Sequence, residues 1–170
     1  KLAPERSITD SLTKLVAFEN QVRELPIERA PQVELSETGK SLAIHYAGRT
    51  LRGDLNRSLM HQIGGRLWPD VAEFSDIAER WQTRFDLSKS QLESDIATAF
   101  TRHDLTVRYF DRSGAPQIYG VVSPKFVRVN QLDFRNAFLE EVRRSTALVP
   151  RTKSVGRTAF GNPVEFFHFD

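Results

Sequence analysis

The spacing of apolar residues predicts two amphipathic helices in the middle of the chain. The first runs from Pro69 to about Phe85, and its apolar positions share one face: Val71, Phe74, Ile77, Ala78 and Trp81. The second opens at Ser88, whose side chain forms an N-terminal capping signal together with Gln91. Its apolar residues follow at i, i+4, i+7 and i+8: Leu92, Ile96, Ala99 and Phe100. Both helices should therefore pack one face into a core and leave the acidic face in solvent.

A helix is also expected near the N-terminus. Residues 7–10 spell the capping box Ser-Ile-Thr-Asp ahead of apolar residues at helical spacing. This helix should continue to about Leu25 and stop at Pro26, because a proline inside a helix removes a hydrogen bond and clashes with the preceding turn. Residues 26–40 show no period and are expected to form a loop.

Two further helices are expected elsewhere in the chain. Asp54 can cap a short one, which the Gly-Gly pair at 64–65 can end through a left-handed residue. The other covers residues 132–142, and either Asn130 or Asp133 can cap it.

Strand patterns occur on both sides of the central helices. Residues 41–51 alternate apolar and polar positions and predict a strand, bent at Gly48. Residues 105–112 and 117–123 flank the turn sequence Ser-Gly-Ala-Pro, which predicts a β-hairpin. A third extended segment is expected at 125–129.

The order of these elements favours an α+β fold, because strands and helices do not alternate regularly enough for a doubly wound sheet. We expect an antiparallel sheet that contains the 105–123 hairpin and is covered on one face by helices. A length of 170 residues favours a single domain over residues 1–170. Because the chain begins with Lys1 and ends in an apolar run, we expect it to be a fragment or the ordered part of a longer protein.

Composition narrows the possible chemistry and location. The apolar fraction of 39% and the charged fraction of 27% are those of an ordered globular protein. The absence of cysteine excludes disulfides, thiolate catalysis and cysteine-ligated zinc. No apolar run approaches the roughly 20 residues that cross a bilayer, and no signal-peptide pattern opens the chain. We therefore expect a soluble, cytoplasmic protein without a membrane partner.

No residue pattern identifies a catalytic, cofactor or metal site. The four histidines form no pair at metal-ligand spacing. The glycines at 48 and 53 have P-loop spacing, but Asp54 stands where such a loop needs lysine. Asp104 and Asp133 are candidates for catalysis, but a role in a turn or a helix cap accounts for an Asp at these positions equally well. We assign no catalytic residue, no metal and no cofactor, and an enzyme of unknown type is the third hypothesis.

The side-chain alternation of the hairpin indicates a surface for nucleic acid. If positions 105, 107 and 109 face the core, the other face carries a ring between two cations, namely Arg108, Phe110 and Arg112. The next segment repeats the pattern with Lys125, Phe126 and Arg128. Such rings can stack bases while the cations hold phosphates. The alternative is that Arg and Phe pair by cation–π contact on a covered sheet face.

Charge is distributed unevenly although the net charge is only +2. Residues 69–100 carry three cations and seven acids, whereas residues 143–157 carry five cations and no acid. The five cations are Arg143, Arg144, Arg151, Lys153 and Arg157. The first two can complement the dipole of the preceding helix. The other three indicate either a flexible basic strap for phosphate or an ordinary solvated loop.

One segment of the chain resembles a known protein family. Residues 118–133, Ile-Tyr-Gly-Val-Val-Ser-Pro-Lys-Phe-Val-Arg-Val-Asn-Gln-Leu-Asp, are similar to a segment of phage- and plasmid-related proteins classed as a domain of unknown function. In that family a strand ending in Ser is followed by an aromatic residue, a basic residue, an Asn or Asp, and a helix. Residues 55–67 resemble a second stretch of the family. The resemblance implies a mobile-element context and DNA metabolism, without catalytic residues to carry over.

Two functional hypotheses follow from these patterns. The first is a nucleic-acid-binding module of a phage or plasmid type protein that anneals or protects single-stranded DNA through the rings and cations named above. The second is a protein–protein or structural module of a phage or plasmid assembly. In that module, the apolar residues 164–169 would complete the sheet of a neighbour, including another copy of the chain.

Overall fold

The computed structural model describes residues 17, 20–126, 131–145, 150–157 and 163–169. The chain forms two compact units, which are described separately: Val22–Phe126, and a second unit built from Lys1–Gln21 with Val127–Asp170. The single domain expected over residues 1–170 stays a prediction.

The first unit is built on a six-stranded sheet with the order β1-β5-β6-β4-β3-β2. Its strands are β1 (Arg23–Pro26), β2 (Gln32–Leu35), β3 (Ser41–Tyr46), β4 (Arg49–Asp54), β5 (Thr106–Arg112) and β6 (Ala115–Val122). All neighbouring strands run antiparallel except β4 and β6, which run parallel. The sheet therefore consists of two antiparallel halves, β1-β5-β6 and β4-β3-β2, joined at the β4–β6 seam.

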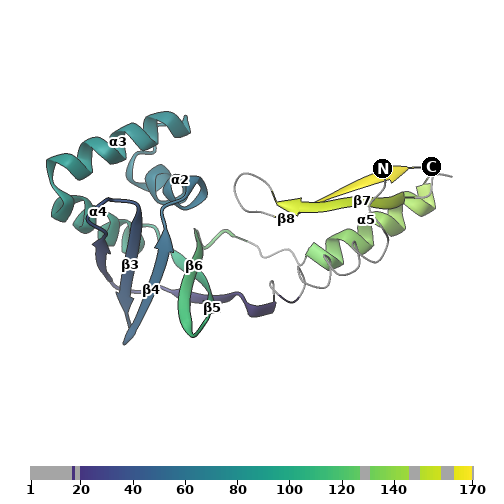
Figure 1. The fold of residues 1–170 in the computed structure, drawn as a ribbon, viewed down its shortest axis with the longest axis horizontal. Coiled ribbons are helices and arrows are strands. Elements are labelled where there is room, and N and C mark those ends of the chain that lie inside the picture. Colours follow the sequence, from purple (N-terminus) through teal and green to yellow (C-terminus); the bar gives the residue numbers. More distant parts are fainter. Residues whose placement is uncertain (1–16, 18–19, 127–130, 146–149, 158–162, 170) are drawn as a thin grey trace. The chain divides into compact units, whose positions relative to one another are not determined.

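Three helices lie on one side of this sheet (Figure 1). They are α2 (Arg57–Leu67), α3 (Phe74–Leu87) and α4 (Lys89–Arg102). Their buried apolar side chains pack against strand residues that alternate along the sheet, such as Ile44, Leu51 and Val107. Burying each of these side chains stabilises the fold by about 1.5–3 kcal/mol. The expected α+β fold, with helices over one sheet face, is confirmed.

Side chains of the helices also complete hydrogen bonds that the strands leave open. The Leu35 amide at the edge strand β2 donates to Glu93 Oε1 over 2.7 Å, which ties α4 to that edge. The Val121 amide of β6 donates to Gln62 Oε1, also over 2.7 Å, which ties α2 to the seam. These bonds fix the helices in register with the sheet, because an unpaired buried amide costs about 1–3 kcal/mol.

The patterns with the strongest periodicity are confirmed. α4 begins at Lys89 after the expected cap, with the Gln91 amide donating to Ser88 Oγ over 3.2 Å. The hairpin at 105–123 forms as β5 and β6, joined by Ser113 and Gly114, whose positive φ angles of 52° and 82° suit a two-residue hairpin turn.

Two short strands were not expected. Residues 23–26, placed at the end of a helix, form β1, because Leu25 and its neighbours pair with β5. Residues 32–35, placed in a loop, form β2 against β3. Each strand has four residues, too few for its alternation to be distinguished from a loop, and each is fixed by pairing with another segment. The rest of the expected N-terminal helix lies largely outside the described residues.

Several boundaries in the middle of the chain were wrong. The bend at Gly48 is a hairpin turn between β3 and β4, with Ala47 and Gly48 at φ angles of 50° and 73°. Asp54 ends β4, and Asn56 caps α2 by accepting from the Leu59 amide over 2.9 Å. The glycines at 64–65 lie inside α2 instead of ending it.

The helix expected from Pro69 begins later, at Phe74. Residues 69–73 instead connect α2 to α3, and Val71 closes a turn by donating from its amide to the Trp68 carbonyl over 3.0 Å. The apolar residues Ile77 and Trp81 are buried as the helical period indicates.

The described part of the second unit contains α5 (Gln131–Ser145), β7 (Pro150–Arg157) and β8 (Pro163–Phe169). β7 and β8 pair antiparallel, and α5 lies against β7 (Figure 1). The interpretation of the basic stretch as a flexible strap or loop is therefore wrong for residues 150–157, which form a strand. Its aperiodic sequence is compatible with a strand because β8 supplies the pairing.

Adjacent glycines in α2 give a test of the helix packing. A Cβ on Gly64 would overlap Ile77 Cγ2 of α3, whereas a Cβ on Gly65 would have no neighbouring atom within 4 Å. We expect Gly64→Ala to lower the free energy of unfolding by about 1–2 kcal/mol, since overpacking outweighs the gain in helix propensity. Gly65→Ala should raise it by up to about 1 kcal/mol. Denaturant unfolding measures both, and equal effects would contradict the close α2–α3 contact.

Candidate nucleic-acid interface

The residues of β5 divide between the two faces of the sheet as the alternation predicts. Val107 and Tyr109, together with Leu105 just before the strand, are buried in the core beneath the helices. Phe110 and Arg112 belong to the opposite face, called the outer face below, which no described helix of this unit covers. The outer face is therefore the surface that carries the rings and cations predicted for this hairpin.

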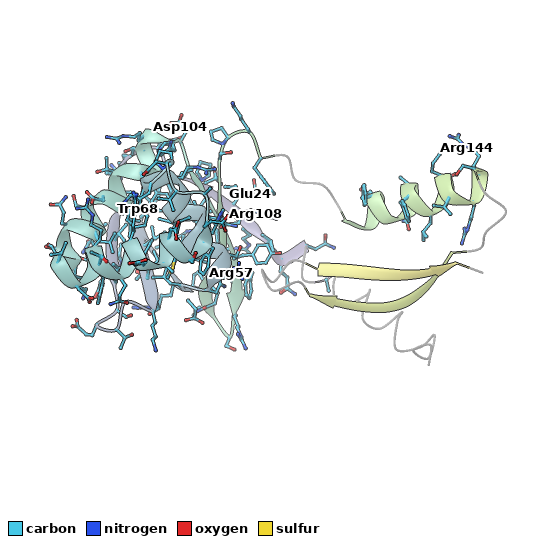
Figure 2. All side chains as sticks on the ribbon, turned by 90° about the horizontal axis from the view of Figure 1, so that it is seen from above. Glu24, Arg57, Trp68, Asp104, Arg108 and Arg144 are labelled. Carbon is cyan, nitrogen blue, oxygen red and sulfur yellow. The ribbon has the colours of Figure 1, made fainter. Side chains whose placement is uncertain are left out.

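Arg108 lies on the outer face but is only 8% exposed. Its guanidinium carbon is 5.2 Å from the ring centroid of Tyr119 and 5.0 Å from that of Phe126. Its Nε is 3.5 Å from Glu24 Oε1, and Figure 2 shows the two labelled side chains next to each other. We call Glu24, Arg108, Tyr119 and Phe126 the Arg108 cluster.

Local backbone features bring both rings to Arg108. The register of β5 and β6 shifts by one residue, so that Arg108 pairs with Gly120 while Tyr109 pairs with Ile118, and Tyr119 is the extra residue. After β6 the chain turns back, with the Phe126 amide donating to the Ser123 carbonyl over 2.9 Å. Pro124 is the second residue of this turn, where its fixed φ is favourable.

In the Arg108 cluster, contacts with the neighbouring side chains offset the cost of burying the Arg108 charge. Removing a guanidinium from water costs several kcal/mol, and an isolated buried charge would not be stable. Two cation–π contacts return about 0.5–2 kcal/mol each. Glu24 adds an ion pair, weakened because its side chain is 45% exposed. Arg108 thus makes the cation–π contacts that were the alternative to a nucleic-acid surface. It holds the rings of Tyr119 and Phe126 in place instead of contacting a ligand.

Other predicted residues around this cluster stay accessible. Phe126 is 42% exposed, and Arg112 and Lys125 are exposed. Phe110 is half-buried and contacts the Tyr119 ring edge-on, with centroids 6.5 Å apart. The segment at 125–129 was expected to be a strand, but Lys125 and Phe126 belong to the turn, and Arg128 lies outside the described residues.

The remaining predicted cations belong to the second unit. Arg143 and Arg144 are exposed in the last turn of α5, and Arg144 donates to Glu141 Oε2 over 2.5 Å. Arg151 and Arg157 pair with His168 and Pro163 of β8, and Lys153 stands where the register shifts. The side chains of these three strand residues lie outside the described part of the chain.

A continuous row of residues crosses the outer face from β2 to β5. Directly paired positions on neighbouring strands are Glu34, Ala43, Arg52, Gln117 and Phe110, which we call the outer row. A hollow of about 270 Å³ lies over its centre, lined among others by Ala43, Arg52 and Gln117. Sequence reasoning missed Arg52, Gln117 and Tyr119. Alternation within β4 could have placed Arg52 on this face, but nothing in the sequence indicates the parallel pairing that brings Gln117 to it.

Charge on the outer face is balanced. Its cations Arg52, Arg108 and Arg112 are matched by Glu24, Glu34 and Asp54, which the strand registers place on the same face. A polyanion would therefore gain little from the field of this face alone. Stacking on rings, rather than phosphate attraction, is the interaction that the face can supply.

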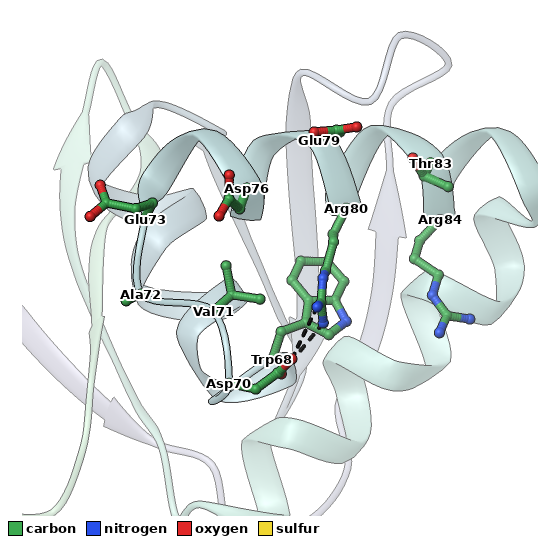
Figure 3. A pocket seen from close by; sticks show the side chains of 10 residues that line it. All are labelled: Trp68, Asp70, Val71, Ala72, Glu73, Asp76, Glu79, Arg80, Thr83 and Arg84. Atoms are coloured by element: carbon green, nitrogen blue, oxygen red, sulfur yellow. Dashed lines mark hydrogen bonds and ion pairs between the residues drawn. The ribbon is translucent and has the colours of Figure 1, made fainter.

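A larger hollow of about 710 Å³ lies between residues 68–73 and the face of α3 that carries Asp76, Arg80 and Arg84 (Figure 3). Arg80 crosses in front of the Trp68 ring and is bound to Asp70, with nitrogen–oxygen distances of 3.0 and 3.4 Å. The lining carries four carboxylates and two guanidinium groups. This acidic excess disfavours phosphate, so the outer face is the better candidate for nucleic acid.

Neither a metal site nor a membrane-spanning helix is found among the described residues. No three His, Asp or Glu side chains among them gather closely enough to hold a metal ion. None of the described helices has the length and apolarity to cross a membrane. Asp104, considered for catalysis, follows α4 with a positive φ of 49°, a backbone role that Asp tolerates well.

A double-mutant cycle tests the Arg108 cluster. We expect Arg108→Met and Phe126→Ala to be coupled by about 0.5–2 kcal/mol in the free energy of unfolding, since each removes the same cation–π contact. Arg108→Met with Phe74→Ala is the control, because Phe74 contacts a different guanidinium, that of Arg57. The control pair should be additive within about 0.5 kcal/mol. Additivity of the first pair would contradict the contact.

Comparisons with known proteins do not identify a function for this chain. The resemblance of residues 118–133 to phage- and plasmid-related proteins stays a prediction. Searches against protein-family models, curated proteins and solved structures find no match to this chain.

Proposed function

We propose that this chain binds single-stranded nucleic acid, DNA in the first place, through the outer face of its sheet. Its role would be to anneal or protect single strands as part of a cytoplasmic phage or plasmid type protein. The observation that carries the proposal is the ring of Phe126, 42% exposed and held against the buried Arg108. Tyr119 and Phe110 extend this aromatic surface along the sheet.

Stacking on such a surface can supply part of the binding free energy. A base stacked on an aromatic side chain contributes about 1–3 kcal/mol, whatever its sequence. The proline-containing turn and the guanidinium contact restrict the Phe126 ring before any ligand arrives, so less side-chain entropy is lost on binding. Two or three stacked bases would then contribute about 2–9 kcal/mol, and phosphate contacts would add to this.

Phosphate contacts would come from the edges of the surface and from the second unit. Arg112 and Lys125 are exposed near the rings. Arg143, Arg144, Arg151, Lys153 and Arg157 supply further positive charge, in a segment that contains no acid. Because the centre of the outer face is neutral overall, these flanking cations should account for the salt dependence of binding.

The alternative is a module of a phage or plasmid assembly that binds a neighbour through residues 164–169. In the described structure these residues lie in β8, which pairs with β7 of the same chain. A neighbour would therefore have to add its strand to an edge of this two-stranded sheet.

Loss of one exposed ring gives the first test of the proposed function. We expect Phe126→Ala to weaken binding to an oligothymidylate by about 1–3 kcal/mol, with little change in the salt slope. Leu87→Ala is the control, because Leu87 is an apolar residue of α3 that is 75% exposed. Fluorescence anisotropy measures the affinity, and circular dichroism checks the fold. Equal affinities of the two variants would contradict base stacking on Phe126.

Replacement of the three β7 cations tests the phosphate contacts. The logarithm of the affinity should fall with the logarithm of salt concentration by about 0.7 for each phosphate neutralised on a single strand. Arg151→Ala, Lys153→Ala and Arg157→Ala together should weaken binding to all sequences and flatten that slope. If the unmodified protein shows no salt-sensitive binding at low ionic strength, the proposal is wrong and the assembly module takes precedence.

A further inference from the structure

The hollow over the outer row has a small, apolar floor and a polar rim. Ala43 forms the floor and is buried, and its short side chain leaves space between the longer side chains of the rim. The rim is formed by Glu34, Arg52 and Asp54, together with Gln117. At about 270 Å³ the hollow is slightly smaller than the roughly 300–1,000 Å³ of ordinary ligand pockets, so it suits one flat heterocycle better than a whole nucleotide.

The polar groups of the rim are available to a ligand. Among the described residues, the side chains of Arg52, Asp54 and Gln117 have no hydrogen-bond or ion-pair partner. Arg52 brings donors only, Asp54 brings acceptors only, and the Gln117 amide brings both. Glu34 adds a further carboxylate, which also contacts His45 Nε2 over 3.3 Å.

This combination of donors and acceptors selects the kind of ligand. Two carboxylates beside one guanidinium repel phosphate and other pure acceptors, so the hollow does not fit an anion. A ligand that accepts from Arg52 must also donate to the carboxylates. Guanine meets this condition, because it offers O6 and N7 as acceptors and its ring and amino N–H groups as donors.

We propose that the hollow binds the edge of a guanine base and gives the module a preference for guanine-containing single strands. This inference rests on the proposed function, since the rings beside the hollow would hold the same strand. Gln117 is paired directly with Phe110, and neighbouring strands are about 5 Å apart. A strand whose base stacks on the aromatic surface therefore brings an adjoining base to the hollow.

A single guanine in an otherwise uniform oligonucleotide tests the inference. The probes are oligothymidylates of about 15 nucleotides, with the central position occupied by thymine, guanine, adenine or cytosine. We expect the guanine probe to bind about 5- to 100-fold more tightly than the other three. All measurements use the full chain at one salt concentration, so that phosphate contacts stay constant.

Substitutions of rim residues test whether the preference for guanine arises in the hollow. Arg52→Met and Asp54→Asn should each reduce the ratio of the affinities for the guanine and thymine probes, measured on the same variant, to within about twofold. Arg102→Met is the matched control, because Arg102 is an exposed arginine at the end of α4, and it should retain the preference. Melting temperatures identify a variant that fails to fold. If Arg52→Met is such a variant, the nearly isosteric Asp54→Asn decides.

Free guanosine separates this inference from the proposed function. If oligonucleotides bind without preference for guanine, the inference is overturned and the proposed function stands. A third outcome is that calorimetry shows guanosine binding, that Arg52→Met abolishes this binding, and that no oligonucleotide binds. The hollow is then supported as a site for a small molecule, and the proposed function is overturned. If neither guanosine nor any oligonucleotide binds, both are overturned.

Discussion

The seam between β4 and β6 is the constraint on which the rest of the first unit depends. Two antiparallel halves of the sheet meet there through a single parallel pair, Arg52 and Gln117. So short a ladder leaves some backbone groups without a strand partner, and the Val121 amide beside it donates a hydrogen bond to Gln62 Oε1 of α2. The halves also approach closely, since a Cβ on Gly53 would lie 2.8 Å from Ile118 Cβ. Small residues and a helix side chain together hold the seam closed.

The Arg108 cluster shows how a cation can serve binding without touching the ligand. Buried and flanked by two rings, Arg108 gives up contact with phosphate and instead fixes the rings that a base would meet. The charge is compensated by Glu24, so the surface above it is neutral and aromatic. This arrangement explains why the proposed interface combines weak local electrostatics with an exposed ring, Phe126.

Sequence patterns predicted what depends on neighbouring residues in the chain, and missed what depends on distant ones. The Ser88 cap, the period of α4 and the alternation of β5 are local, and all are found in the structure. β1 and β2 exist only through pairing with other segments, and their four residues carry too little pattern. The shift that adds Tyr119 to the Arg108 cluster and the parallel pairing that brings Gln117 beside Arg52 have no local signal, so neither Tyr119 nor Gln117 could be predicted as part of the site.

The topology also orders the events of folding. β2, β3 and β4 form a meander of adjacent hairpins, and the three helices follow directly in the chain, so these elements can assemble through contacts of low sequence separation. β6 meets β4, and β5 meets β1, only after a long stretch of chain has closed, which is a step of high contact order and hence slow. A partly folded chain would carry Ala43 and Arg52 without Gln117, Phe110 or the Arg108 cluster. Docking of the β5–β6 hairpin therefore completes the outer row, and the same step adds Val107, Tyr109 and Val121 to the core, so a chain arrested before it would lack both a finished core and the interface.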